Sequence, residues 1–170
     1  LLLSNGLGFG DELRAILPDL KLFFGTTTEG AYRLAEQHIR HAGHGLTRIG
    51  RVENSTPPSW YEAWAEAVRP SIWDNNIEQA LWLKLAINCA INPLTALHGC
   101  CNGELAEAPL ANQVQILCRE IMAVSAAAGF AAVTGDLPQQ VAAVIHSTAG
   151  NRSSMLQDVT AGRGTEIEYI

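Results

Sequence analysis

In the first third of the chain, short runs of apolar residues are separated by turn-forming residues. Short apolar runs bounded by glycine or by an Asn-Gly turn indicate strands, whereas apolar residues three and four apart indicate helices. The predicted elements are strands at residues 1–4 and 22–28, helices at 11–17 and 30–41, and a glycine-punctuated strand or hairpin edge at 41–50. Residues 1–55 are therefore predicted to be α/β in character.

From Trp60 onward the apolar spacing becomes helical. The predicted helices span residues 60–67, 76–92, 112–128 and 137–149, and a glycine follows each of the last two. Because proline restricts the residue before it, the long helix is expected to end or kink at Asn92, which precedes Pro93. Thr165 and Glu168 have the spacing of a capping box, which predicts that a further helix begins there. Residues 56–170 are therefore predicted to be all-α.

A polar, proline-rich segment at residues 53–59 separates the two patterns. It contains Asn54, Ser55, Pro57 and Pro58. This composition is typical of a linker or a domain boundary. The sequence therefore predicts two parts, residues 1–55 and residues 56–170.

The charge balance narrows the classes of partner. The 11 basic and 17 acidic residues give a net charge of −6, and the basic residues form no cluster, so a nucleic-acid partner is not expected. No uninterrupted apolar run reaches the roughly 18 residues of a membrane span, and the opening Leu-Leu-Leu lacks the basic flank of a signal peptide. The chain is predicted to be soluble and cytoplasmic, with no membrane partner.

Cysteine and histidine do not show the spacing of metal ligands. The four cysteines include no Cys-x-x-Cys pair, and the five histidines repeat no ligand or triad spacing. We interpret the cysteines as reduced, packed thiols, with a redox role for the adjacent Cys100 and Cys101 as the alternative. The histidines are interpreted as surface or packed residues. No metal site is predicted.

A thin polar stripe crosses the most apolar predicted helix. Lys84, Asn88 and Asn92 are four residues apart, which places them on one helix face, and apolar residues fill the positions between them. Asparagine is a poor helix former, so two in such a helix suggest a reason other than propensity. One interpretation is that these residues bind a small polar ligand, with Lys84 half-buried. The alternative is a polar contact between helices with a lysine that extends to water.

Two loops carry further polar residues. Asn102 lies in a predicted turn before Gly103, and Asn-Gly is a common turn dipeptide whatever else Asn102 does. Residues 151–154, which are Asn151, Arg152, Ser153 and Ser154, precede a predicted helix start, where such residues act as caps and free amides can hold a carboxylate. Glu166 is interpreted as an acid in a first helical turn. The pattern alone does not choose between cap and anion site.

Together these segments resemble the ketopantoate reductase family. The resemblance rests on Ser4-Asn5-Gly6, Gly25-Thr-Thr-Thr28, the run from Lys84 to Ala96, Asn102-Gly-Glu104, the Ser-Ser-Met-Leu-Gln-Asp run at 153–158 and Thr165-Glu-Ile-Glu168. It implies an NADPH-dependent reduction of 2-dehydropantoate (ketopantoate) to pantoate, on the way to pantothenate and coenzyme A. It also implies a fold in which the α/β remnant of a Rossmann domain, residues 1–55, is followed by an all-α helical domain, residues 56–170.

The resemblance also implies roles for individual residues. Lys84 matches the proton donor to the reduced carbonyl. The residues that match substrate-binding positions are Lys84, Asn88, Asn92, Asn102, Asn151, Arg152, Ser153 and Ser154, and those that match cofactor-binding positions are Asn5, Ala31 and Glu166. The expected partner is the small-molecule substrate, and the protein is expected to be a monomer or a homodimer.

The resemblance leaves two alternatives to this function. One is a related reductase of the same fold that acts on another 2-keto acid. The other is a non-catalytic helical module for dimerisation or ligand binding, in which Lys84 and the two asparagines hydrogen-bond only to one another across a pair of helices. The chain is expected to be a fragment that lacks the glycine-rich cofactor loop and the C-terminal tail, and to be inactive by itself.

Overall fold

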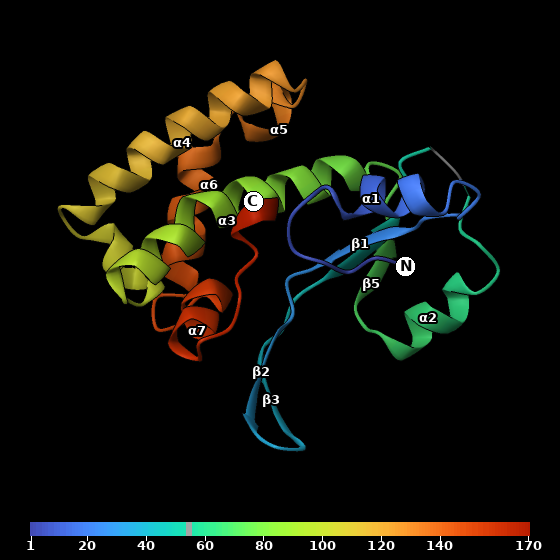
Figure 1. Cartoon of the computed structure of the whole chain (residues 1–170), viewed down its shortest axis with the longest axis horizontal. Helices are drawn as coiled ribbons and strands as arrows, with labels where there is room; N and C mark the ends of the chain where they lie inside the picture. Colours follow the sequence, from blue (N-terminus) through green and yellow to red (C-terminus); the bar gives the residue numbers. More distant parts are fainter. Residues whose placement is uncertain (54–55) are drawn as a thin grey trace. The chain divides into compact units, whose positions relative to one another are not determined.

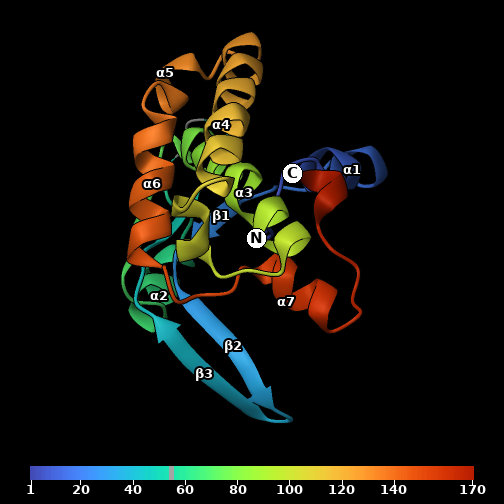
Figure 2. The same ribbon diagram turned by 90° about the vertical axis from the view of Figure 1, so that its left-hand side faces the viewer.

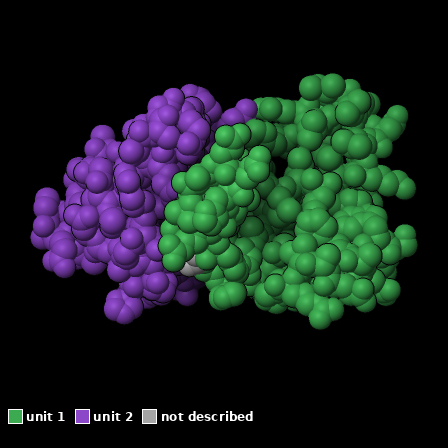
Figure 3. Space-filling model, turned by 90° about the horizontal axis from the view of Figure 1, so that it is seen from below, with its two compact units in different colours: residues 1–4, 8–81 green, residues 5–7, 82–170 purple. Residues whose placement is uncertain are grey.

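The computed structural model describes residues 1–53 and 56–170. The chain divides into two compact units, one formed by Leu1–Ser4 and Gly8–Leu81 and the other by Asn5–Leu7 and Trp82–Ile170 (Figure 3). The part of the predicted linker at residues 54–55 lies outside the described residues. The predicted domain boundary between residues 55 and 56 stays a prediction.

A small three-stranded sheet forms the centre of the first unit (Figure 1). Its order is β1 (Phe24–Thr27), β4 (Thr47–Gly50) and β5 (Ser71–Trp73), with β1 antiparallel and β5 parallel to β4. Ile49 on the central strand is fully buried. Gly50 is required there because a Cβ would lie 2.1 Å from the carbonyl oxygen of Asp74. The sequence pattern missed β5 because its pairing with β4 is non-local.

Two helices and one bridge complete the N-terminal elements. Helix α1 (Phe9–Ile16) and helix α2 (Tyr61–Ala67) lie close to their predicted bounds. The predicted strand at residues 1–4 was too long, since the structure has only an isolated parallel bridge between Leu2 and Phe24. Residues 1–53 are therefore α/β in character, as predicted, and the first unit extends this character to Leu81.

Residues 30–43 form a β-hairpin, so the predicted helix at residues 30–41 was wrong. The hairpin consists of β2 (Gly30–Ala35) and β3 (His38–Gly43), paired antiparallel and seen side by side in Figure 2. Gln37 has a φ of 60°, and this left-handed conformation reverses the chain between the strands. All side chains from Ala31 to His41 are exposed, so no helical face could be buried there.

Helix α3 (Ile77–His98) is longer than the sequence predicted. Its 22 residues continue through Pro93 to His98. The prediction that the helix ends at Asn92 was therefore wrong, and the alternative of a kink there stays a prediction. Ala86, Ala90 and Leu94 are buried in the core cluster of the second unit, and this packing supports the helix beyond the proline.

By length and composition alone, α3 is able to cross a membrane, with a mean hydropathy of 1.3 in its most apolar window. The sequence search for an uninterrupted apolar run did not find it because Lys84 and two asparagines interrupt the helix. A single helix of this kind is a weak indication, since the core helix of a soluble protein passes the same test.

The second unit is helical and packs around one core. After α3 come η1 (Asn102–Ala106), α4 (Leu110–Ala127), α5 (Ala131–Thr134), α6 (Leu137–Ser147), α7 (Ser154–Thr160) and η2 (Ile167–Tyr169). Leu137, Val141 and Cys118 are fully buried in its core cluster. Trp82 stacks on Phe130 with ring centroids 4.3 Å apart, and its indole N–H donates to Ser125 Oγ at 2.9 Å. The predicted helical part is confirmed, except that residues 56–170 are not all-α, because β5 at Ser71–Trp73 pairs with β4.

The capping box predicted at Thr165 was wrong. Glu166 occupies the N-cap position of the three-residue turn η2 and no side-chain capping bond forms. A capping box does form at η1, where the Cys101 backbone N–H donates to Glu104 Oε1 at 2.8 Å. The Asn102-Gly turn therefore begins a short 3₁₀ helix.

Candidate functional site

The polar stripe lies on one unbroken stretch of α3. Lys84 and Asn88 are half-buried and Asn92 is only 7% exposed, so burial increases along the stripe. Desolvation by burial lowers the pKa of the Lys84 ammonium from its ordinary value of 10.5. A lysine in this position gives up its proton more readily than one whose head is in water.

Thr95, one turn after Asn92, ties the stripe to the loop at residues 151–154. Its hydroxyl is fully buried, donates to the Asn92 carbonyl oxygen at 2.9 Å and shares a 2.6 Å hydrogen bond with Ser153 Oγ. Ser153 is also the N-cap of α7, because its Oγ accepts the Leu156 N–H at 3.0 Å. The capping interpretation of Ser153 is therefore correct, and the same hydroxyl reaches α3.

We expect Thr95→Val to lower the free energy of unfolding by about 1–3 kcal/mol, because it leaves the buried Ser153 hydroxyl and the Asn92 carbonyl without this partner while keeping the side-chain shape. Urea unfolding followed by circular dichroism measures it. Thr160→Val is the matched control, since Thr160 is exposed and water can replace its hydroxyl. Equal losses in the two variants would contradict a special role for the Thr95–Ser153 bond.

Asn102 joins η1 to the loop that precedes α7. Its backbone N–H donates to the Asn151 carbonyl oxygen at 2.9 Å, and its side-chain Nδ2 donates to Thr148 Oγ1 at 2.8 Å. A Cβ on Gly103 would lie 2.8 Å from the Ala149 Cβ, so glycine permits this close approach. Asn102 Oδ1 is buried and, among the described residues, accepts no hydrogen bond. This oxygen is therefore able to accept a hydrogen bond from a bound ligand.

The remaining loop residues are exposed. Arg152 turns toward α7, where its Nη2 donates to Thr160 Oγ1 at 2.9 Å, and the Ser154 hydroxyl donates to Glu166 Oε1 at 3.3 Å. Asn151 is exposed beside them. The structure thus brings the predicted substrate loop and Glu166 together.

Two of the three predicted cofactor residues lie in adjoining segments of the same unit. The Leu7 N–H donates to the Tyr169 carbonyl oxygen at 3.1 Å, so the segment Asn5–Leu7 lies against the turn that follows Glu166. Gly6 has a φ of 81°, and a Cβ there would lie 2.4 Å from the Tyr169 oxygen. Ala31 is exposed on β2 in the other unit.

The sequence pattern did not indicate the two threonines that hydrogen-bond to Ser153 and Asn102. Thr95 lies within the run that carries the resemblance and Thr148 follows helix α6, but neither was assigned a role. A threonine at one helical turn from Asn92 was the only local signal for Thr95. Its partner Ser153 is 58 residues away, and no periodicity encodes that distance.

The cysteines behave as packed thiols. All four are free, and burial raises the pKa of Cys89, Cys100 and Cys118. A raised pKa disfavours the reactive thiolate. This supports the packing interpretation over a redox role for Cys100.

Comparison with known proteins decides the family. Residues 76–170 match the family described as "Ketopantoate reductase PanE/ApbA C terminal", and residues 1–54 match "Ketopantoate reductase PanE/ApbA". The chain belongs to the ketopantoate reductase family. The resemblance seen in the sequence is thereby confirmed, and so is the fold class of a partial Rossmann-like sheet followed by a helical part.

Similar members of the ketopantoate reductase family support this assignment. The 2-dehydropantoate 2-reductase of Shigella flexneri is 43% identical over the whole of this chain, which covers 55% of that relative. The crystal structure of a PanE/ApbA family ketopantoate reductase from Ralstonia eutropha JMP134 has a TM-score of 0.82 and 26% identity, covering 99% of this chain and 55% of that one. The chain thus spans about half the length of the curated relatives it matches.

The ketopantoate reductase fold is shared with another enzyme. The structure of D-mandelate dehydrogenase with NADH has a TM-score of 0.81 at 20% identity, and the match covers 99% of this chain and 64% of that one. This similarity concerns the fold alone.

Proposed function

We propose that the full-length protein reduces ketopantoate to pantoate with NADPH as the hydride donor, in the biosynthesis of pantothenate and coenzyme A. Curated relatives at 37–43% identity carry the name 2-dehydropantoate 2-reductase, which supports the substrate. The observation that carries the proposal is Lys84, a half-buried lysine with a lowered pKa on a face that also presents Asn88 and Asn92. We further propose a cytoplasmic location and a monomeric or homodimeric state.

Lys84 serves as the general acid. Reduction of a 2-keto group places negative charge on the carbonyl oxygen, and a positioned ammonium both polarises that oxygen and donates a proton to it. Desolvation makes the ammonium a stronger acid than a solvated lysine. The neutral amine left after the transfer regains its proton from water before the next turnover.

Polar groups of α3, of η1 and of the loop at residues 151–154 hold the substrate. Asn102 Oδ1, the buried acceptor without a partner, receives the hydrogen bond of the substrate hydroxyl. Asn88 and Asn92 offer amide groups along the same helix face as Lys84. The substrate carboxylate is bound by the exposed Asn151 amide and Arg152 guanidinium and by the backbone amide of Ser154 at the start of α7, beside the α7 cap Ser153.

The cofactor-binding residues are proposed to be Asn5, Ala31 and Glu166. Asn5 and Glu166 are half-buried polar residues in adjoining segments, which suits the amide and hydroxyl groups of a nicotinamide nucleotide. NADPH supplies the hydride when it is bound. The hydrogen bond from Ser154 to Glu166 orients the carboxylate beside the substrate loop.

The substrate hydroxyl provides the test of this function. Ketopantoate and 3,3-dimethyl-2-oxobutanoate differ only by that hydroxyl, and a site built to bond a hydroxyl rejects the analogue without it. We expect the full-length protein to consume NADPH with a kcat/KM for ketopantoate at least about 10²-fold above that for the analogue. Assays with NADPH and NADH in parallel report the cofactor preference.

Asn102→Ala is the matched variant, because it removes the acceptor proposed for the hydroxyl. The ratio between the two substrates should then fall toward one. A native protein that prefers the analogue or another 2-keto acid would favour the related reductase. Absence of NADPH consumption with every 2-keto acid would favour the non-catalytic binding module.

A further inference from the structure

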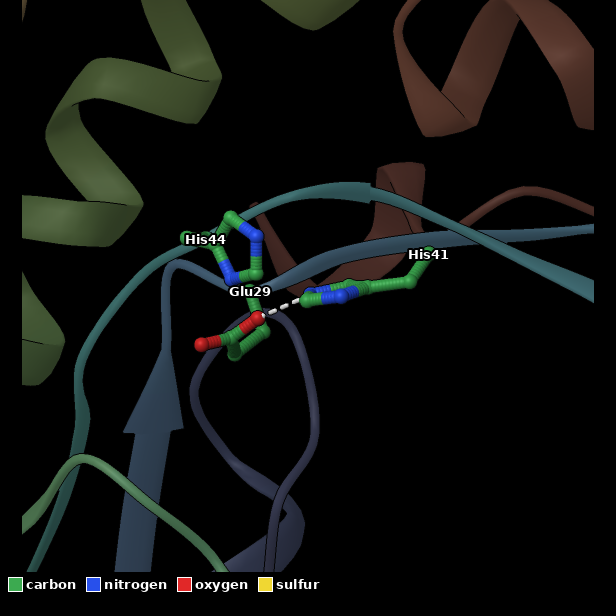
Figure 4. A group of neighbouring side chains, drawn as sticks. All are labelled: Glu29, His41 and His44. Atoms are coloured by element: carbon green, nitrogen blue, oxygen red, sulfur yellow. Dashed lines mark hydrogen bonds and ion pairs between the residues drawn. The ribbon is translucent and has the colours of Figure 1, made fainter.

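Three potential metal ligands meet at the base of the β2–β3 hairpin. Glu29 directly precedes β2, His41 lies on β3, and His44 follows β3. Their ligand atoms all lie within 4.8 Å of one another. Figure 4 shows the Glu29 carboxylate facing the His41 ring, with which it forms an ion pair, and the His44 ring beside both of them.

The backbone around the three residues is held in place by its own contacts. The Gly45 N–H donates to Glu29 Oε1 at 2.9 Å, and the Leu46 N–H donates to Thr28 Oγ1 at 2.9 Å. A Cβ on Gly45 would lie 2.3 Å from the Thr28 carbonyl carbon, so the two segments touch through glycine. These contacts fix the Glu29 carboxylate and the position of His44 next to it, as outer contacts do around metal ligands.

A simple ion pair between Glu29 and His41 does not require a second histidine beside it. The Gly45 amide and the His41 ring both hydrogen-bond to the Glu29 carboxylate. One histidine is sufficient to pair with it. The second imidazole instead packs edge-on against the first with ring centroids 4.5 Å apart. Two imidazoles and a carboxylate are the donor set of many sites for zinc and similar divalent ions.

We propose that Glu29, His41 and His44 bind a divalent first-row transition-metal ion of the zinc class, with the fourth position open to water. Zinc lies about 2.0–2.2 Å from nitrogen and oxygen ligands, which sets neighbouring tetrahedral ligands roughly 3.4 Å apart. The most widely separated ligand atoms therefore have to approach by at most about 1.4 Å, whereas Glu29 and His41, which are in hydrogen-bond contact, have to move apart to admit the ion. Both changes are within the reach of side-chain rotamers. The ion replaces the hydrogen bond between Glu29 and His41.

This site is independent of the proposed reductase activity. It involves neither Lys84 nor the loop at residues 151–154, and all three ligands belong to the first unit. The spacing of the cysteines and histidines predicted no metal site, and Glu29 lies 12 residues before His41, a spacing that no short ligand motif contains.

Calorimetric titration of the full-length protein with Zn²⁺ tests the proposal. We expect saturable binding that is weakened by about tenfold or more in Glu29→Gln and in His44→Ala. His38→Ala is the matched control, because His38 is an exposed histidine on the same strand outside the cluster, and it should bind Zn²⁺ as the native protein does. His38 and His44 are both exposed, so replacing either one with alanine should not unfold the protein.

Absorption spectra with Co²⁺ separate this site from binding by the free cysteines. Ligation by Glu29, His41 and His44 produces visible d–d bands without the near-ultraviolet charge-transfer band of a cobalt–thiolate bond. The proposal is overturned if no saturable binding occurs below about 1 mM Zn²⁺. It is equally overturned if His44→Ala and His38→Ala bind alike, or if the bound cobalt shows thiolate ligation.

Discussion

Replacement of Lys84 by alanine in the full-length protein is expected to lower kcat for ketopantoate reduction by about 10²- to 10⁴-fold, the usual contribution of a general acid. The reason is that the developing alkoxide loses its proton donor and the cation that polarises the carbonyl. NADPH consumption at saturating ketopantoate measures the change. Circular dichroism spectra and urea unfolding establish that the variant is folded.

The chain provides a closely matched control. It has two lysines, and Lys21 is exposed outside the proposed site, so Lys21→Ala makes the same chemical change without loss of turnover. Lys84→Arg adds a second comparison, because arginine keeps the charge but does not release its proton. It should bind substrate better than Lys84→Ala yet turn over as slowly. Full activity of a folded Lys84→Ala protein would exclude the general-acid role.

The pH profile reports the same group. Reduction needs the Lys84 ammonium, which is present below its pKa, so the rate should fall as pH rises through that pKa. Because desolvation lowers this pKa, the midpoint of the fall should lie below the ordinary lysine value of 10.5. The step should be absent from the residual activity of Lys84→Ala. A native midpoint at or above 10.5 would contradict desolvation of the ammonium.

Replacement of Leu137 by alanine is expected to lower the free energy of unfolding of the helical unit by about 2–5 kcal/mol. Leu137, at the start of α6, is fully buried in the core cluster with residues such as Val114, Cys118 and Ala90 from other helices. Truncation removes apolar contacts and leaves a cavity that the surrounding helices fill only in part. The midpoint of urea unfolding, followed by circular dichroism at a helical band, measures the loss.

Leu97→Ala is the control for that experiment. Leu97 is on α3 but is 76% exposed, so its truncation should change the free energy of unfolding by no more than about 0.5 kcal/mol. A loss below about 1 kcal/mol in Leu137→Ala would mean that this core position collapses without leaving a cavity.

Local patterns predicted the elements whose stability is local. The three long helices α3, α4 and α6 followed from the 3.6-residue period of their apolar positions, because a helix bonds to itself and needs only one face to bury. The short helix α5 was not predicted. The placement of Lys84, Asn88 and Asn92 on one face followed from the same period. The helix end expected at Asn92 did not occur, because core packing of Leu94 and its neighbours outweighs the local preference of the residue before proline.

The strand region was predictable only in outline. Residues 30–41 contain apolar residues at spacings that suit a helix, yet they form β2 and part of β3, because the chain reverses at Gln37 and the strands bond to each other. The pairing of β4 with β5 joins Ile49 to Trp73, far apart in the sequence. A strand is stabilised by pairing with another strand, and the sequence of one strand does not show which segment it pairs with.

Residue types and their spacing were enough to predict the family, the long helices and the polar face that carries Lys84. The folded chain was needed to show that Thr95 bonds Ser153, that Asn102 retains a buried acceptor, and that Glu29 meets His41 and His44. The physical reason is the range of the interactions. Helix faces arise from bonds between residues four apart, whereas these side chains meet through the packing of elements that lie between 12 and 58 residues apart in the chain.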